Sequence, residues 1–245
     1  MPAPFTLPFI KKEQIAKETY SFYFDKTKNP DYSFKPGQYT RVTLPITPTD
    51  DKGSFRYFTT CSSPLENYLL ISTKISDDAT KVSDFKKYFS NLQVGQKVQF
   101  FGPMGGFLLP EEDLTPRVLL AGGIGITPFH SMLTFAAKKQ LQMPLTLFVS
   151  FSTVAELIFL EELQKCKQQN QNINVIYTIS HPENSSWQGE TGRISEELIK
   201  KYVQDLSKPI FMVAGPPPMV DGTVEMLQKI GIEEEKIKVD HFTGY

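Results

Sequence analysis

The sequence contains little cysteine. Cys61 and Cys166 are the two cysteines among 245 residues. Two thiols cannot supply the four thiolates of an iron–sulfur cluster, and they cannot build the disulfide framework of a small secreted domain. Sparse cysteine use is typical of proteins that are kept reduced, so we expect a cytoplasmic protein without a fused iron–sulfur domain.

Long apolar runs and an excess of one charge are also lacking. No apolar run reaches the roughly 18 residues that suggest a membrane span, and Met1–Phe5 lacks the features of a signal peptide. The 26 basic and 27 acidic residues give a net charge of −1, which gives no reason to expect a nucleic acid or an anionic membrane as partner. His130, His181 and His241 do not stand at metal-ligand spacing, so we expect no metal site.

The first part of the chain has the pattern of a small β-structure. Short aromatic and β-branched runs alternate with turn residues such as Asn29-Pro30 and Pro36-Gly37. Many short strands at this spacing predict an antiparallel barrel. One amphipathic helix interrupts them, with Ser83 near its start. The expected strands are Tyr20–Phe24, Tyr39–Leu44, Tyr68–Thr73 and Lys97–Phe101.

After about residue 112 the pattern changes to apolar strands that alternate with amphipathic helices. Glu111–Pro116 is the expected boundary, so residues 1–112 form one domain and residues 113–245 the other. The βαβα order predicts a parallel sheet covered on both faces. Thr153 and Glu156 fit a capping box before the second helix. The expected strands are Val118–Ala121, Leu145–Ser150, Asn174–Ile179 and Ile210–Ala214, and the expected helices are Phe129–Lys139, Glu156–Cys166, Ser195–Val203 and Val220–Ile230.

The segment Leu119–Pro128 carries the most information. An apolar strand runs into Gly122-Gly123-Ile124-Gly125 and then into Thr127-Pro128, which suit the N-cap and first turn of a helix. Glycines allow a sharp turn and let the backbone approach a phosphate, which the free N–H groups at a helix start attract. The spacing G-x-G-x-x-P differs from the G-x-G-x-x-G of a Rossmann fold. This pattern favours a pyrophosphate site over a tight turn that binds nothing.

Two further segments complete a pattern. Arg56-Tyr57-Phe58-Thr59 lies at the end of an expected barrel strand, and Ala214–Met219 follows the fourth parallel strand. Together with the glycine loop, and in this order, they resemble the ferredoxin–NADP reductase family of flavin- and pyridine-nucleotide-dependent oxidoreductases. The ending Asp240–Tyr245 is similar to that of its compact bacterial members. The resemblance implies a six-stranded antiparallel β-barrel that binds FAD, followed by a five-stranded parallel, doubly wound α/β sheet that binds the nicotinamide nucleotide.

The resemblance also implies roles for single residues of the FAD site. Arg56 would pair with the FAD pyrophosphate, Phe58 would stack on the isoalloxazine where tyrosine is commoner, and Thr59 would hydrogen-bond to flavin N5. Taken alone, the same motif could be a strand with one exposed arginine and a core phenylalanine. Ser83 could equally be an N-cap and nothing more. The implied FAD-binding residues are Arg56, Tyr57, Phe58, Thr59, Ser72, Thr73, Lys74, Val82 and Ser83.

For the nicotinamide nucleotide, the resemblance implies the glycine loop and the segment after the fourth parallel strand. Ala214 stands where the family usually has a cysteine beside the hydride path, so this chain departs from the family there. Phe242 is expected to cover the flavin, the role of Tyr245 is left open, and Met219 is expected to pack the adjacent helix. The implied residues are Gly122, Gly123, Gly125, Thr127, Pro128, Gly215, Pro216, Met219 and Tyr245, with Thr59, Ala214 and Phe242 at the reaction centre.

The activity that this resemblance implies is hydride transfer from NAD(P)H to FAD. Electrons would then pass to a separate acceptor, which could be a ferredoxin, a flavodoxin, an oxygenase component or a small oxidant. Ser150–Thr153 and Ser180–Pro182 supply no permanent cation for a 2′-phosphate, and Arg193 is the one nearby candidate, so NADH is favoured over NADPH. A monomer is expected. The alternatives are an electron-transfer subunit of a larger complex and a non-catalytic flavoprotein.

Overall fold

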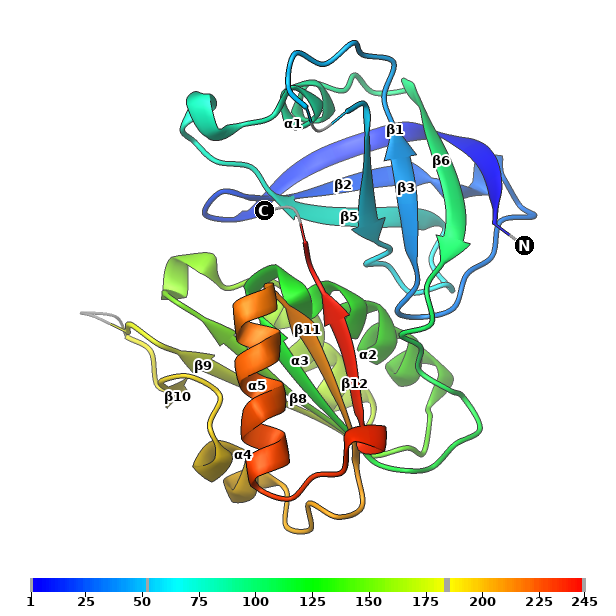
Figure 1. The fold of residues 1–245 in the computed structure, drawn as a ribbon. Coiled ribbons are helices and arrows are strands. Elements are labelled where there is room, and N and C mark those ends of the chain that lie inside the picture. The colour runs from blue at the N-terminus through cyan, green and yellow to red at the C-terminus, as the bar shows by residue number, and fades with distance from the viewer. Residues whose placement is uncertain (1, 52, 183–185, 244–245) are drawn as a thin grey trace. The chain divides into compact units, whose positions relative to one another are not determined.

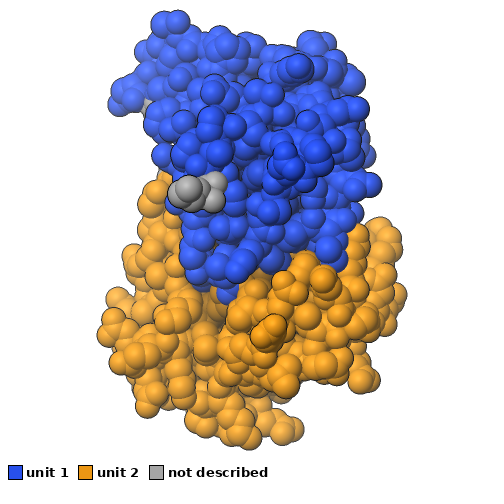
Figure 2. Space-filling model, turned by 90° about the vertical axis from the view of Figure 1, so that its right-hand side faces the viewer, with its two compact units in different colours: residues 1–108 blue, residues 109–245 orange. Residues whose placement is uncertain are grey.

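The computed structural model describes residues 2–51, 53–182 and 186–243. The chain divides into two compact units, residues 1–108 and residues 109–245 (Figures 1 and 2). The first unit is built almost entirely of strands, and the second alternates strands and helices. Among the described residues, no helix combines the length and apolar character needed to cross a bilayer.

Unit 1 is an antiparallel six-stranded sheet with the order β4-β3-β6-β1-β2-β5 (Figure 1). The chain just past β4 turns to β5, because the Cys61 N–H donates to the Leu70 carbonyl at 2.8 Å. The sheet therefore curls on itself, which confirms the predicted barrel architecture. Its strands are β1 (Ala3–Ala16), β2 (Thr19–Asp25), β3 (Tyr39–Thr43), β4 (Phe55–Thr59), β5 (Tyr68–Lys74) and β6 (Lys97–Met104).

The longest strand of unit 1, β1, was not among the expected strands. Its first half pairs with β6 and its second half with β2, and the register shifts between Phe9 and Lys11. Pro4 and Pro8 lie in the first half, and proline is usually evidence against a strand because it cannot donate to the ladder. Because the two halves of β1 pair with different strands, apolar and polar residues do not alternate regularly along it. The sequence pattern that would predict a strand is therefore weak.

The interior of unit 1 is aromatic, and the helix α1 (Asp84–Ser90) closes it. The ring of Phe89 lies 4.2 Å from that of Phe22, and Phe24 lies edge-on to Phe100 at 5.0 Å. Ser83 caps α1 by accepting the Lys86 N–H at 3.3 Å, which is the alternative role that the sequence left open for it. The chain passes through two short 3-10 turns, Lys26–Lys28 and Ala79–Lys81.

Unit 2 is a parallel sheet with the order β10-β9-β8-β7-β11-β12. It has six strands in the described chain where five were expected. The additional strand is β10 (Glu190–Thr191), whose two residues are too few to show a strand pattern. The other strands are β7 (Arg117–Gly122), β8 (Leu145–Phe151), β9 (Ile173–Ile179), β11 (Ile210–Gly215) and β12 (Ile237–His241).

Helices cover both faces of this sheet (Figure 1). Leu198 and Ile199 of α4 and Val220 and Leu227 of α5 share one apolar core with β7 and β11. The helices α2 and α3 pack against each other, and Figure 1 shows them on the opposite face. The doubly wound prediction is thereby confirmed. The helices are α2 (Thr127–Lys139), α3 (Leu160–Gln169), α4 (Glu196–Tyr202) and α5 (Pro217–Lys229), and 3-10 turns occur at Gly123–Ile126, Val154–Glu156 and Glu234–Lys236.

Three predicted helix starts were wrong, and one of them is that of α5, which begins at Pro217 rather than Val220. Thr127 is already helical and is no N-cap, because the 3-10 turn before it leads directly into α2, and its hydroxyl donates to the Ile124 carbonyl at 3.0 Å. The second helix begins at Leu160 rather than Glu156. Phe159 interrupts the chain with a left-handed φ of 58°, and its ring lies 4.1 Å from that of buried His130. Tertiary packing at Phe159 therefore overrides the capping pattern at Thr153.

At the start of β7, a buried cation is held by a partly exposed carboxylate. The Arg117 side chain is 4% exposed and forms an ion pair with Asp113, which is 41% exposed. Hydrogen bonds from the side chain and backbone of Thr115, together with Arg117, lower the pKa of Asp113 to about 2. Because an unfolded aspartate has a pKa of about 3.9, this group stabilises the fold above pH 4 and loses its contribution as the pH falls toward 2.

We therefore expect Asp113→Asn to be less stable than the wild type at pH 7, with a difference that shrinks between pH 4 and pH 2. Urea unfolding at pH 7, 4 and 2.5 measures this difference. A difference that stays constant over that range would mean that the Asp113 carboxylate does not contribute through its charge.

Candidate functional site

Part of the candidate site in unit 2 is the turn that leaves β7. Gly123 has a φ of +53°, and a Cβ built on it would meet nothing within 4 Å. Gly125 differs completely, because its Cβ would lie 2.2 Å from the Ala214 carbonyl oxygen. Gly123 thus presents open backbone before α2, whereas Gly125 allows the 3-10 turn Gly123–Ile126 to pack directly on the end of β11. The sequence did not distinguish these two roles.

The segment that leaves β11 meets this turn. Gly215 has a φ of +153°, and its Cβ would lie 3.2 Å from the Gly122 carbonyl oxygen. The Met219 sulfur lies beside both glycines, 3.2 Å from the Cβ position of Gly122 and 3.4 Å from that of Gly215. Pro216 precedes α5 in an extended conformation. Two of the predicted nucleotide-binding segments, far apart in the sequence, are therefore in contact.

The position of this contact in the sheet has a physical meaning. The strand order reverses between β7 and β11, because the chain winds outward from β7 through β8 and β9 and then returns to β11. In open parallel sheets, ligands bind outside the carboxyl ends of the strands at such a switch point. Gly122, Gly123 and Gly215 lie at these carboxyl ends.

Several predicted residues of this region are interior rather than exposed. Ala214 is fully buried in the middle of the sheet, beside Ala121 and Asp240. Thr127 is 2% exposed, and Pro128 is buried as well. The open part of the turn is therefore backbone, which suits a phosphate held by N–H groups.

The last described residues extend β12 past the same edge. The Phe242 N–H donates to the Gly215 carbonyl at 2.9 Å, and His241 Nε2 lies 2.9 Å from the carboxylate of Asp221 on α5. Burial raises the pKa of the Asp240 carboxyl, and the neighbouring His241 opposes this shift. Phe242 is thereby anchored beside the glycine turn, and Tyr245 lies outside the described residues.

In unit 1, the Arg56–Thr59 motif forms most of β4, and its side chains alternate. Arg56 and Phe58 pair with Val42 and Thr40 of β3, both fully buried, so they face the interior side of the sheet. The Phe58 ring stacks on that of Phe89 at 5.7 Å, with 9° between the planes. Phe58 therefore offers an aromatic platform that is only half-buried.

The alternate residues of β4 have different surroundings. Tyr57 is 56% exposed and contacts the rings of Tyr39 and Phe55 edge-on at 5.9 and 5.8 Å. Thr59 is half-buried at the end of the strand. Tyr57 therefore lies on the opposite face of β4 from Arg56 and Phe58, so one flat ligand cannot lie on all three side chains.

Arg56 has a crowded environment. Its guanidinium donates to the carbonyls of Gly53 at 3.0 Å and Phe55 at 2.6 Å, and it lies over the Phe85 ring at 5.1 Å. The Asp50 carboxylate lies 4.0 Å from Nη2, and the arginine side chain is 18% exposed. A forked cation at a partly exposed position fits a diphosphate group.

The remaining residues predicted to bind FAD lie on β5 and before α1. Ser72 and Thr73 are buried, and the Ser72 hydroxyl lies 2.8 Å from that of Ser21. The Lys74 carbonyl accepts from the Lys86 ammonium at 2.7 Å. The Val82 N–H is used in a turn with Ala79. The hydroxyl groups of β5 thus take part in the barrel's own packing.

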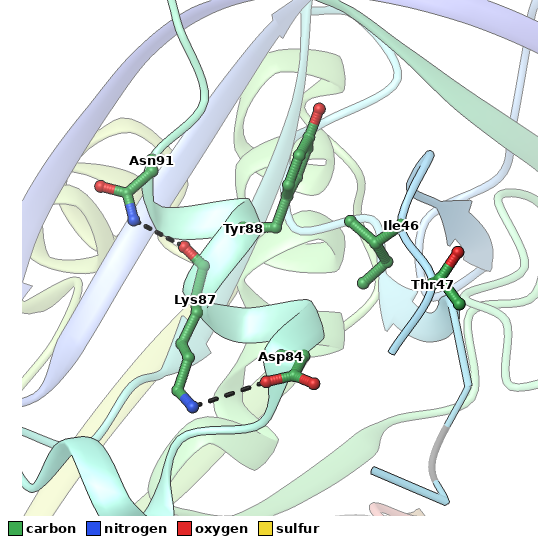
Figure 3. Close-up of a pocket in the computed structure, with 6 residues that line it drawn as sticks. All are labelled: Ile46, Thr47, Asp84, Lys87, Tyr88 and Asn91. Atoms are coloured by element: carbon green, nitrogen blue, oxygen red, sulfur yellow. Dashed lines mark hydrogen bonds and ion pairs between the residues drawn. The ribbon is translucent and has the colours of Figure 1, made fainter. Parts of the chain in front are cut away.

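A pocket that the sequence did not indicate lies along one face of α1 (Figure 3). Its volume is about 460 Å³. Figure 3 shows Lys87 reaching back to Asp84, and the distance between the ammonium and the carboxylate is 3.5 Å. The lining residues come from α1 and from the segment after β3: Ile46, Thr47, Asp84, Lys87, Tyr88 and Asn91.

Comparisons with known proteins match both units. The family model described as an oxidoreductase FAD-binding domain matches residues 6–108, and the one described as an oxidoreductase NAD-binding domain matches residues 119–225. The chain belongs to the ferredoxin reductase-like family. FAD-binding and NAD-binding domains of this family therefore correspond to units 1 and 2.

Individual members of the family are distant relatives. The chain is 25% identical over 235 residues to a flavohemoprotein of Oceanobacillus iheyensis, covering 95% of this chain and 57% of the relative. It is 26% identical over 217 residues to the reductase component of propane 2-monooxygenase of Mycolicibacterium smegmatis, covering 87% and 60%. The chain thus spans less than two thirds of the length of these relatives.

Solved structures with the same fold agree with this family. The crystal structure of a cytochrome P450 reductase of Amycolatopsis superposes with a TM-score of 0.83 at 20% identity, covering 99% of this chain and 71% of that chain. This likeness shows the two-domain fold of the family, a barrel followed by a parallel α/β sheet.

Proposed function

We propose that the protein is an FAD-dependent NAD(P)H oxidoreductase that passes electrons to a separate acceptor. The observation that carries this proposal is the meeting of the Gly122–Gly125 turn with Gly215 at the switch point between β7 and β11. The matches of the two units to FAD-binding and NAD-binding domains support it. In this proposal residues 1–112 bind FAD and residues 113–245 bind the nicotinamide nucleotide.

The chain's own residues have binding and orienting roles in this mechanism. FAD, when bound, would supply the redox chemistry of hydride acceptance and electron release. Arg56 would hold its diphosphate, Phe58 would support one face of the ring system, and Thr59 would hydrogen-bond at its reacting edge. Gly123 would give the nucleotide phosphates access to backbone N–H groups, and Phe242 would cover the flavin.

NADH is the proposed donor. The His181 N–H donates to the Ser152 carbonyl at 2.8 Å, so these residues lie together at the carboxyl ends of β8 and β9. Neither carries a permanent cation, and a 2′-phosphate is usually bound by arginine or lysine. Arg193 is exposed and follows Gly192, which bonds to Ile179 at the end of β9. If the donor is NADPH instead, Arg193 is the residue that would bind its 2′-phosphate.

The proposed acceptor is a separate protein or small oxidant, as the name of the propane monooxygenase reductase component suggests. An electron-transfer subunit of a larger complex is the second candidate, because Phe55 and Tyr57 expose 41% and 56% of their surface on one face of β4. As part of the oxidoreductase proposal, we propose that the protein is a cytoplasmic monomer.

Anaerobic titration of the FAD-loaded protein with NADH and then NADPH tests the function. We expect NADH to bleach the flavin absorption rapidly and NADPH to do so slowly. A flavin that neither nucleotide reduces would overturn the oxidoreductase and leave a non-catalytic flavoprotein.

Ala214→Cys is the informative variant in the same experiment. Because the family usually carries cysteine there, we expect the variant to reduce flavin faster by about an order of magnitude. Its thermal unfolding is the control, since Ala214 is fully buried and the larger side chain must fit. An unchanged rate in a folded variant would show that Ala214 does not limit hydride transfer.

A further inference from the structure

We propose that Asp50 competes with the FAD diphosphate for Arg56 and thereby weakens FAD binding. The loop between β3 and β4 that carries Asp50 is described at residues 44–51 and 53–54. The inference rests on the proposed function, because it takes Arg56 as the residue that pairs with the diphosphate.

The first step is that the guanidinium of Arg56 already has partners within its own chain. Two carbonyls of this chain segment, those of Gly53 and Phe55, accept from the guanidinium, and the Asp50 carboxylate lies 4.0 Å from its Nη2. Carboxylate and phosphate oxygens use the same guanidinium donors. The side of Arg56 that a diphosphate needs is therefore directed toward an anion of its own chain.

The second step is the attachment of the loop to α1. The Asp84 N–H donates to the Asp50 carboxylate at 3.0 Å, and the Asp84 carboxylate accepts from the backbone N–H and the hydroxyl of Thr49 at 2.7 and 2.5 Å. These reciprocal bonds fasten the loop to the first turn of the helix. Asp50 is thus held in place from two sides, by Arg56 and by α1.

The third step is electrostatic. FAD brings two negative charges to Arg56, and a carboxylate within a few ångströms of a diphosphate repels it strongly at a partly buried position. Pairing of Arg56 with FAD therefore either separates Arg56 from Asp50 or places the diphosphate beside that carboxylate, and both arrangements lower the affinity for FAD and slow its association. The consequence is a flavin that exchanges with solution.

The experiment compares the FAD affinity of the wild type with that of Asp50→Asn, measured by quenching of flavin fluorescence and by stopped-flow association. Asparagine keeps the shape and an oxygen that can accept the Asp84 N–H, and it removes only the charge. We expect about tenfold tighter FAD binding with faster association. Asp51→Asn is the matched control, because Asp51 is the exposed neighbour, and we expect its affinity to stay unchanged.

A double-mutant cycle with Arg56→Gln locates the effect. We expect the gain from Asp50→Asn to vanish in the Arg56→Gln background, because the competition takes place at Arg56. Unchanged or weaker FAD binding by Asp50→Asn, or a gain that persists without Arg56, would overturn the competition. Asp50→Ser, which is shorter and neutral, gives the same comparison if the asparagine variant folds poorly.

The same measurements separate this proposal from the proposed function. If Arg56→Gln alone leaves FAD binding unchanged, Arg56 does not hold the cofactor and the assignment of the site fails. If Arg56→Gln weakens binding while Asp50→Asn has no effect, only the competition fails.

Discussion

Gly125→Ala is expected to destabilise unit 2 by more than about 3 kcal/mol and to abolish NADH binding. The added Cβ would lie 2.2 Å from the Ala214 carbonyl oxygen and 2.6 Å from the Gly215 Cα. Both atoms belong to the backbone, so no side-chain rotation can relieve the overlap. The 3-10 turn Gly123–Ile126 would have to separate from the end of β11, and this contact forms the proposed nucleotide site.

Fluorescence makes this prediction specific to one unit. Trp187 is the one tryptophan of the sequence and lies in unit 2, where its indole N–H donates to the Glu190 carbonyl at 2.8 Å. Its emission during urea unfolding therefore reports the stability of unit 2 separately from that of the barrel.

Gly222→Ala is the matched control for the same chemical change. Gly222 lies within α5, and a Cβ there would meet nothing within 4 Å. We expect this variant to be stabilised by about 0.5–1 kcal/mol, because alanine favours a helix interior over glycine. Equal stabilities of the two variants would contradict the close approach of the Gly123–Ile126 turn to β11.

The second large effect is expected at Arg56. Arg56→Gln should raise the dissociation constant for FAD by about 10- to 100-fold, since charge-assisted hydrogen bonds contribute roughly 1.5–3 kcal/mol. Arg56→Lys should have a dissociation constant for FAD between those of the wild type and Arg56→Gln, because lysine keeps the charge and loses the forked geometry. Equilibrium titration with FAD, followed by flavin fluorescence, measures both.

Arg41→Gln is the control for the loss of one arginine charge. Arg41 lies on the neighbouring strand β3, and its guanidinium packs over the rings of Phe55 at 5.4 Å and Phe101 at 5.0 Å. It points away from the Arg56 face, so we expect nearly unchanged FAD affinity. A comparable loss in both variants would indicate a general charge effect rather than a site at Arg56.

The corrections to the predicted elements have a common origin. The start of α3 was misplaced because buried Phe159 adopts a left-handed conformation against His130, and β1 was missed because one strand serves two neighbours. In both cases contacts between distant residues outweigh a local pattern. Where the pattern and the packing agree, as for β8, the predicted element is confirmed.

The sequence by itself determined the fold class, the order of the two domains and the segments that carry the candidate site. The fold class and the glycine turn after β7 follow from strand and helix periodicity and from glycines at turns, which are local properties of the chain. The Arg56–Thr59 and Ala214–Met219 segments follow from the resemblance to the family. Tertiary structure alone decided that Gly123 is open while Gly125 is packed on Ala214, and that Asp50 lies beside Arg56. Those distinctions depend on which distant backbone and side-chain atoms come within a few ångströms, and no local pattern encodes such distances.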